Sequence, residues 1–106
     1  MDCIKILYHY IMQQSQKDKK NERDLAAHVL AMLIEQYDYS KCTDNANHFL
    51  NYLIEHAENE SMLSRTTYSH CLMYLLKTNE LAQIFVSKNG FHILRRFLTN
   101  DCLQNS

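Results

Sequence analysis

Apolar residues recur along this chain at the three- and four-residue spacing of amphipathic helices. Ile4, Leu7 and Ile11 fall on one face of a helix predicted over residues 2–13. The polar run over residues 14–21 breaks this periodicity and predicts a loop. Further helices are predicted over 22–36, over 44–58, from Ser61 or Ser64 to Lys77, over 79–88 and over 91–99.

Two local features add detail to this helical pattern. The segment from Leu25 to Ile34 is apolar almost all round, which predicts that the helix over 22–36 is the most buried one. Gly90, the sole glycine, follows Asn89 between the last two helices. We expect the chain to turn sharply there through a positive φ.

Segments about 42 residues apart resemble one another. The stretch over 24–34 aligns with 66–76 at a displacement of 42 positions. A second helix type recurs, because 6–11 aligns with 49–54 at a shift of 43, and 49–54 aligns with 93–98 at a shift of 44. The identical positions in the first pair are His28 and His70, Leu30 and Leu72, and Leu33 and Leu75.

A helical repeat of about 40–47 residues is typical of HEAT and armadillo arrays, whose units bury their apolar faces by stacking on neighbours. We therefore predict an all-α, armadillo/HEAT-like right-handed α-solenoid of two to three repeats. Residues 1–106 are expected to form a single helical repeat domain that is a fragment of a longer array. Its first and last helices are expected to expose Ile4, Leu7, Ile93 or Phe97.

Composition narrows the functional classes. The chain has 46% hydrophobic residues, one glycine and no proline, which favours packed helices over turn-rich sheets. A net charge of -1 gives no general attraction to nucleic acid or to an anionic membrane. No stretch reaches the roughly 18 apolar residues of a membrane span, and no phosphate-binding loop or known catalytic motif occurs. We predict a cytoplasmic protein that is not an enzyme.

Four cysteines and six histidines raise the question of disulfides and metal sites. No two cysteines have C-x-x-C spacing, which favours reduced thiols. His70 and Cys71 are adjacent on a helix and point about 100° apart, so they are poorly placed to bind one ion. We expect no metal and no cofactor, and interpret His28 and His70 as a structural or groove-facing histidine ladder. A catalytic Cys–His pair that meets only in space stays open as an alternative.

The final third of the chain resembles an armadillo repeat, with a short first helix, a glycine and a second helix over 91–98. Nearly the whole chain is similar to the regulatory H subunits of V-type proton ATPases. The stretches that carry this resemblance are 25–33, 51–54, 68–80 and 86–94. The similarity rests on the order and spacing of these stretches, and it covers part of the N-terminal domain of that family.

This resemblance implies a non-catalytic regulatory subunit on the cytosolic face of endomembranes. Such a subunit would bind other V-type ATPase subunits of the peripheral stalk and help to couple ATP hydrolysis to proton transport. It would have no small-molecule substrate and no nucleic-acid partner. One alternative is a generic armadillo adaptor for another complex, and a small helical enzyme or metal protein is an alternative from a different class.

The candidate binding residues lie on the repeated helices. Peptide-binding armadillo grooves commonly use a Trp and an Asn four residues apart, and the matching positions here are 28 with 32 and 70 with 74. The chain has no tryptophan, which argues against that type of groove. Two interpretations stay open, namely a groove that binds a different peptide or helix through Met and Tyr contacts, and plain packing of these residues. The candidate protein-binding surface comprises His28, Met32, His70, Tyr74, Arg95 and Arg96.

Overall fold

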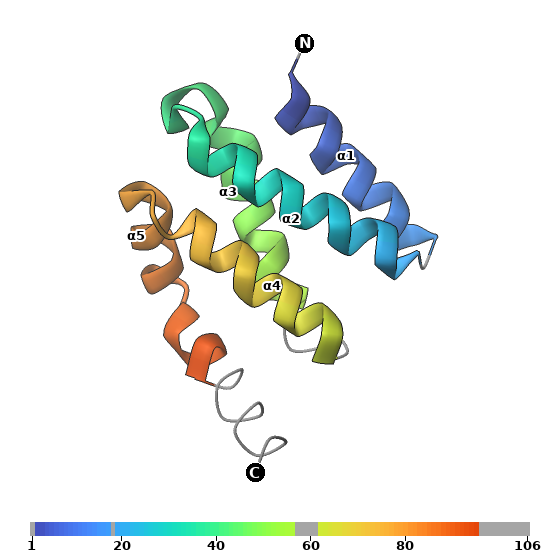
Figure 1. Ribbon diagram of the computed structural model, residues 1–106. Helices are drawn as coiled ribbons and strands as arrows, with labels where there is room; N and C mark the ends of the chain where they lie inside the picture. The colour runs from blue at the N-terminus through green and yellow to red at the C-terminus, as the bar shows by residue number, and fades with distance from the viewer. Residues whose placement is uncertain (1, 18, 57–61, 96–106) are drawn as a thin grey trace.

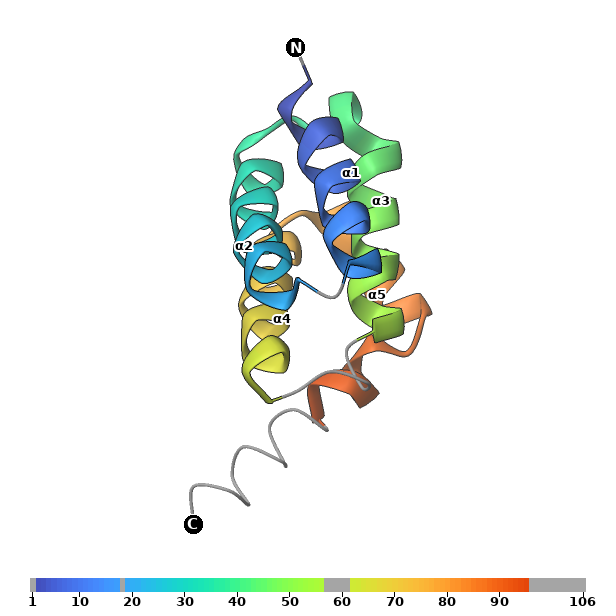
Figure 2. The ribbon, with the colours of Figure 1, turned by 90° about the vertical axis from the view of Figure 1, so that its right-hand side faces the viewer.

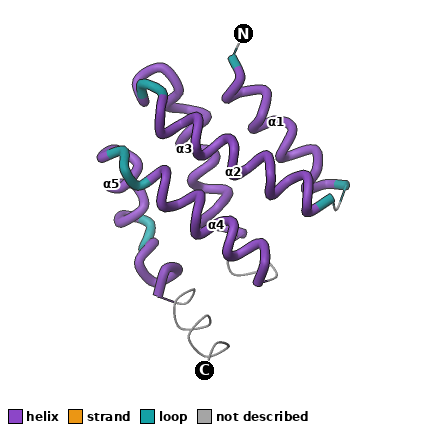
Figure 3. The backbone as a smooth tube through the Cα atoms, in the orientation of Figure 1, coloured by secondary structure: helices purple, strands orange, loops and turns teal. Residues whose placement is uncertain are grey.

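Helices form almost all of the computed structural model, which describes residues 2–17, 19–56 and 62–95. The elements are α1 (Cys3–Gln16), α2 (Lys20–Gln36), α3 (Tyr39–His56), α4 (Met62–Leu75) and α5 (Asn79–Ser87). A further helical segment covers residues 90–95. Within these ranges, short loops or turns separate α2 from α3 and α4 from α5, and no strand occurs (Figure 3). The prediction of an all-α fold is confirmed for this part of the chain.

The helices pack in two layers. Figure 2 shows α2 and α4 side by side in one layer and α1 and α3 side by side in the other. Within this arrangement α2 runs antiparallel to α1 and parallel to α4 (Figure 1), and these two neighbours supply most of its contacts. The shortest dimension of the molecule is 19 Å, as expected for two layers of helices that are each about 10 Å across.

Small residues allow α2 to lie close to its neighbours. Ala26, Ala27 and Ala31 are buried along α2, where they leave room for the helix on either side. Larger apolar side chains fill the space between the two layers. Those that are fully buried include Ile11, Leu30, Phe49, Leu50, Leu53, Leu72, Leu75 and Leu81.

Several predicted helix bounds were wrong. The first helix continues to Gln16 instead of ending at residue 13. Gln14 is buried and the Ser15 hydroxyl bonds across to α3, so tertiary contacts favour the helix there despite the polar sequence. α3 begins at Tyr39, earlier than expected, and bends at Cys42, where φ is -134° and ψ is 23°. Residues 57 and 58 of the predicted helix lie outside the described residues.

One of the two residues predicted to cap the fourth helix, Ser64, does not do so. It lies inside α4, buried, with its hydroxyl bonded to side chains of α2. The other proposed cap, Ser61, lies outside the described residues.

The turn before residues 90–95 also differs from the prediction. Asn89, not Gly90, has the positive φ, at 61°. Asparagine tolerates this left-handed region better than most residues. Gly90 instead begins the next helical segment, where an added Cβ would overlap the ring of Phe85. The glycine is therefore required by close packing.

Four apolar side chains were predicted to be candidates for exposure in the first and last helices. Ile4 and Ile93 are buried, so the prediction was wrong for both, and Leu7 is half-buried. Phe97 lies outside the described residues. Among the apolar side chains at these two ends, Ile6 on α1 and Phe91 in the last segment do face solvent. None of the described helices is long and apolar enough to cross a membrane.

Candidate protein-binding face

Equivalent residues of α2 and α4 lie next to each other at the 42-residue offset read from the sequence. The rings of His28 and His70 are 6.2 Å apart between centroids. Just beyond the C-terminal end of α4, the Lys77 ammonium lies 3.1 Å from the carboxylate of Glu35 on α2. The expectation that His28 and His70 occupy matching positions on neighbouring helices is confirmed.

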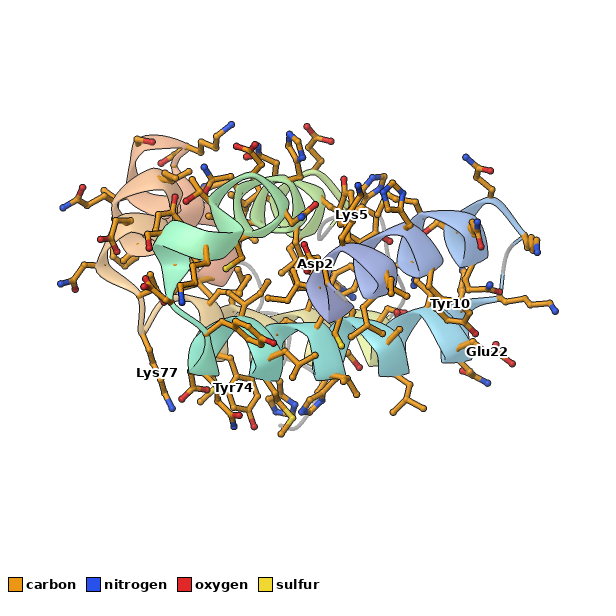
Figure 4. The ribbon with its side chains drawn as sticks, turned by 90° about the horizontal axis from the view of Figure 1, so that it is seen from above. Asp2, Lys5, Tyr10, Glu22, Tyr74 and Lys77 are labelled. Atoms are coloured by element: carbon orange, nitrogen blue, oxygen red, sulfur yellow. The ribbon has the colours of Figure 1, made fainter. Side chains whose placement is uncertain are left out.

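A solvent-open hollow of about 400 Å³ lies at this helix pair. Its lining residues are His28, His70, Met73, Tyr74 and Lys77. The ring of Tyr74 lies 5.7 Å from that of His28, and the Lys77 ammonium lies 5.6 Å from the centre of the Tyr74 ring. Figure 4 shows Tyr74 and Lys77 projecting from the same side of the molecule, away from the α1/α3 layer.

Next to the hollow, α2 exposes a stripe of apolar side chains. Leu25, Val29 and Met32 follow one another at helical spacing, and Leu25 is 69% exposed. Across from them on α4, Met73 is 67% exposed. We predicted that α2 would be the most buried helix because its sequence is apolar almost all round, but one of its apolar faces is open to solvent. We call the hollow and these four apolar residues together the outer α2/α4 face.

No protein-family model, curated protein or solved structure matches this chain.

The six predicted binding residues do not form one surface. His28, His70 and Tyr74 meet in the hollow, and Met32 lies on the adjoining apolar stripe. Arg95 is exposed in the segment over 90–95 and does not line the hollow. Arg96 lies outside the described residues.

Met73 and Lys77 were missed as members of the site. They follow His70 at spacings of three and seven residues, which is the periodicity of one helix face. Met73 lies on α4, and Lys77 lies in the turn just after its end. Glu35, which pairs with Lys77, lies 42 positions before it. Helical spacing from His70, combined with the repeat offset, would therefore have identified all three.

The two cysteines that the structure shows buried, Cys71 on α4 and Cys42 on α3, are not activated nucleophiles. Burial, together with the nearby Asp24 carboxylate, raises the pKa of the Cys71 thiol to about 12. Burial also raises the pKa of Cys42. Thiolates are the reactive form of cysteine, so both side chains stay protonated and unreactive near neutral pH. Within the described residues, no group of three His, Cys, Asp or Glu side chains is placed to hold a metal ion.

Towards the N-terminal ends of α2 and α4, the same helix contact buries a polar cluster. Arg23 is only 4% exposed and donates from Nε to Asp24 at 2.9 Å and from a terminal nitrogen to Ser64 at 3.1 Å. The Ser64 hydroxyl donates in turn to the second oxygen of Asp24 at 2.6 Å. The three side chains therefore satisfy one another across the two helices.

Two tyrosines extend this cluster to the other layer. The Arg23 guanidinium lies over the Tyr68 ring, 5.7 Å from its centre. The Tyr68 hydroxyl is 3.1 Å from that of Tyr52, which is 2.9 Å from the hydroxyl of Ser15. A chain of polar contacts thus connects α2 and α4 with α3 and α1. We call these six residues (Ser15, Arg23, Asp24, Tyr52, Ser64 and Tyr68) the buried polar cluster.

Proposed function

We propose that this chain is a non-catalytic module of armadillo/HEAT-like type that binds a partner protein through its outer α2/α4 face. One observation carries the proposal, namely the exposed apolar stripe beside an open hollow. A contiguous apolar patch that is exposed to solvent is typical of interaction sites. The flexible side chains of Met32 and Met73 can adapt their shape to a partner.

The arrangement of the helices supports the repeat assignment. α2 and α4 are parallel neighbours at the 42-residue offset, and α1 and α3 pair in the second layer. Stacked helix pairs of this kind form an extended binding surface. Such a surface suits a regulatory or scaffolding subunit.

The partner is proposed from the sequence resemblance alone. Its similarity to the regulatory H subunits favours the peripheral stalk subunits of a V-type proton ATPase. The module would then help to couple ATP hydrolysis to proton transport from the cytosolic face of the membrane, without hydrolysing ATP itself.

Titration of the purified chain against purified stalk subunits tests this proposal. Tyr74→Ala and Met73→Ala should each weaken binding, because buried interface anchors typically contribute about 2 kcal/mol, or about 30-fold in Kd. Val86→Ala is the matched surface control, since Val86 is also exposed but lies on α5. This control should bind as the unsubstituted protein does.

A core variant separates binding from folding. Leu72→Ala should cost about 2–5 kcal/mol of folding free energy and weaken binding only through the loss of folded protein. Equal effects of Val86→Ala and Met73→Ala would exclude the outer α2/α4 face as the binding surface. Binding to an unrelated protein through this face, with none to any ATPase subunit, would favour a generic adaptor.

A further inference from the structure

The hollow brings two imidazoles and a thioether together from two helices. His28 comes from α2, and His70 and Met73 come from α4, one helical turn apart. All three side chains line the same hollow, which is open to solvent. Imidazole and thioether are both metal ligands, and a thioether selects soft ions such as Cu(I).

The spacing of the two rings suits a bridging ion. Two metal–nitrogen bonds of about 2 Å each, added to the two ring radii, separate opposed imidazole centres by about 6 Å. The observed separation is 6.2 Å. The rings are inclined at 64°, so one must turn its nitrogen toward the other. His70 is exposed and has room to rotate about its Cβ–Cγ bond.

We propose that His28, His70 and Met73 form a binding site for a soft, monovalent metal ion, with Cu(I) as the natural member of this class. Zn²⁺ in protein sites normally takes four ligands, or three and a water, from nitrogen, oxygen and thiolate donors. Among the described residues, no third side chain of that kind joins the two histidines. The Lys77 ammonium at the rim of the hollow also disfavours a dication more than a monocation.

This site goes beyond the proposed protein-binding role and is tested on the isolated chain, so either can fail without the other. Ag(I) is the probe, because it has the ligand preference of Cu(I) and needs no reducing agent. Cys3 is exposed, and thiols would compete for silver. All variants are therefore made in a Cys3→Ser, Cys102→Ser background, whose helical spectrum and melting temperature are checked first.

Methyl-labelled methionine gives a readout that is specific to the site. We expect the Met73 methyl resonance to shift to saturation at one equivalent of Ag(I), while that of Met32 shifts little. His28→Gln or His70→Gln should lower the affinity by more than about tenfold, the loss that even outer-shell substitutions at metal sites produce. Met73→Leu should weaken Ag(I) binding similarly. His92→Gln, which changes an exposed histidine outside the hollow, is the matched control and should change nothing.

The dependence of Ag(I) binding on pH and its comparison with Zn(II) complete the test. Binding should weaken in acid, where protonated imidazoles no longer coordinate. A Met73 methyl resonance that ignores Ag(I) would overturn the proposal. So would unchanged affinity in the His28→Gln, His70→Gln double variant, or tighter binding of Zn(II) than of Ag(I) at the same resonances.

Discussion

The two ends of the α2/α4 contact each join polar residues about 42 positions apart, but one contact is buried and the other is exposed. Near the N-terminal ends of these helices, Arg23 reaches Ser64, 41 positions away, and both side chains are buried. Near the C-terminal ends, Glu35 reaches Lys77, 42 positions away, at a similar distance of 3.1 Å. There the Lys77 side chain is 62% exposed, against 5% for that of Arg23.

This difference in burial decides what each polar contact contributes. A buried ion pair has lost its hydration, so removing one partner leaves the other charge uncompensated. An exposed pair keeps most of its hydration and is weakened by salt, so it contributes little. Breaking the buried contact should therefore lower the free energy of unfolding strongly, whereas breaking the exposed contact should change it little.

The largest effect is expected at the buried end. Arg23→Ala should lower the free energy of unfolding by about 3–5 kcal/mol, because it leaves the Asp24 carboxylate without its buried partner. Urea denaturation followed by circular dichroism measures the change. Lys77→Ala is the matched control at the exposed end. Equal losses in the two variants would refute the contrast between the two ends.

A smaller effect is expected in alkali, where the buried thiol of Cys71 has to ionise. Its pKa rises from the ordinary 9.0 to about 12 in the folded chain, first through burial and then through Asp24. The folded state thus prefers the neutral thiol, so stability is intact below pH 9.0 and is lost as the pH rises toward about 12. By pH 11, about two pH units above the ordinary pKa, the loss should reach about 3 kcal/mol.

Denaturation curves at pH 8 to 11 measure this slope. Cys71→Ala should flatten it relative to the unsubstituted chain, although the variant is less stable throughout because it leaves a small cavity. An unchanged alkaline slope in Cys71→Ala would show that the thiol does not titrate in this window.

A third effect comes from the link between the layers. Tyr52→Phe removes the hydroxyl that lies between Ser15 and Tyr68, and should cost about 1–2 kcal/mol because those two groups lose a buried partner. Tyr10→Phe, at an exposed tyrosine of α1, is the control and should stay within about 0.5 kcal/mol. A Tyr52→Phe variant as stable as this control would mean that the cluster does not connect the layers energetically.

The sequence periodicity predicted the helices and the neighbours across α2 and α4, but not which polar neighbours are buried. Residues 23 and 77 are both cationic, and both reach across the helix contact. They differ because the other layer covers only Arg23. The Arg23 guanidinium lies over the ring of Tyr68, and the Tyr68 hydroxyl contacts Tyr52 of α3, which in turn contacts Ser15 of α1. That cover depends on how α1 and α3 pack, which a repeat offset does not specify.

The site was predicted to a similar degree. His28, His70 and Tyr74 were expected on one groove and do share one hollow. The exposed stripe of α2 was not foreseen, because apolar residues all round a helix indicate a core and an interface equally well. Gly90 was identified as special for the wrong reason, since its neighbour Phe85 excludes a side chain there and Asn89 makes the turn.

The smallest effect is expected at the exposed end, and its salt dependence makes the contrast quantitative. A double-mutant cycle with Glu35→Gln and Lys77→Met should give a coupling energy of about 0.2–1 kcal/mol at low salt. Near 1 M salt the screening length falls to about 3 Å, so the coupling should nearly vanish. The cost of Arg23→Ala should change little over the same range, because that pair is shielded from the solvent ions. A Glu35–Lys77 coupling above about 2 kcal/mol, or one insensitive to salt, would mean that the exposed pair also holds the two helices together.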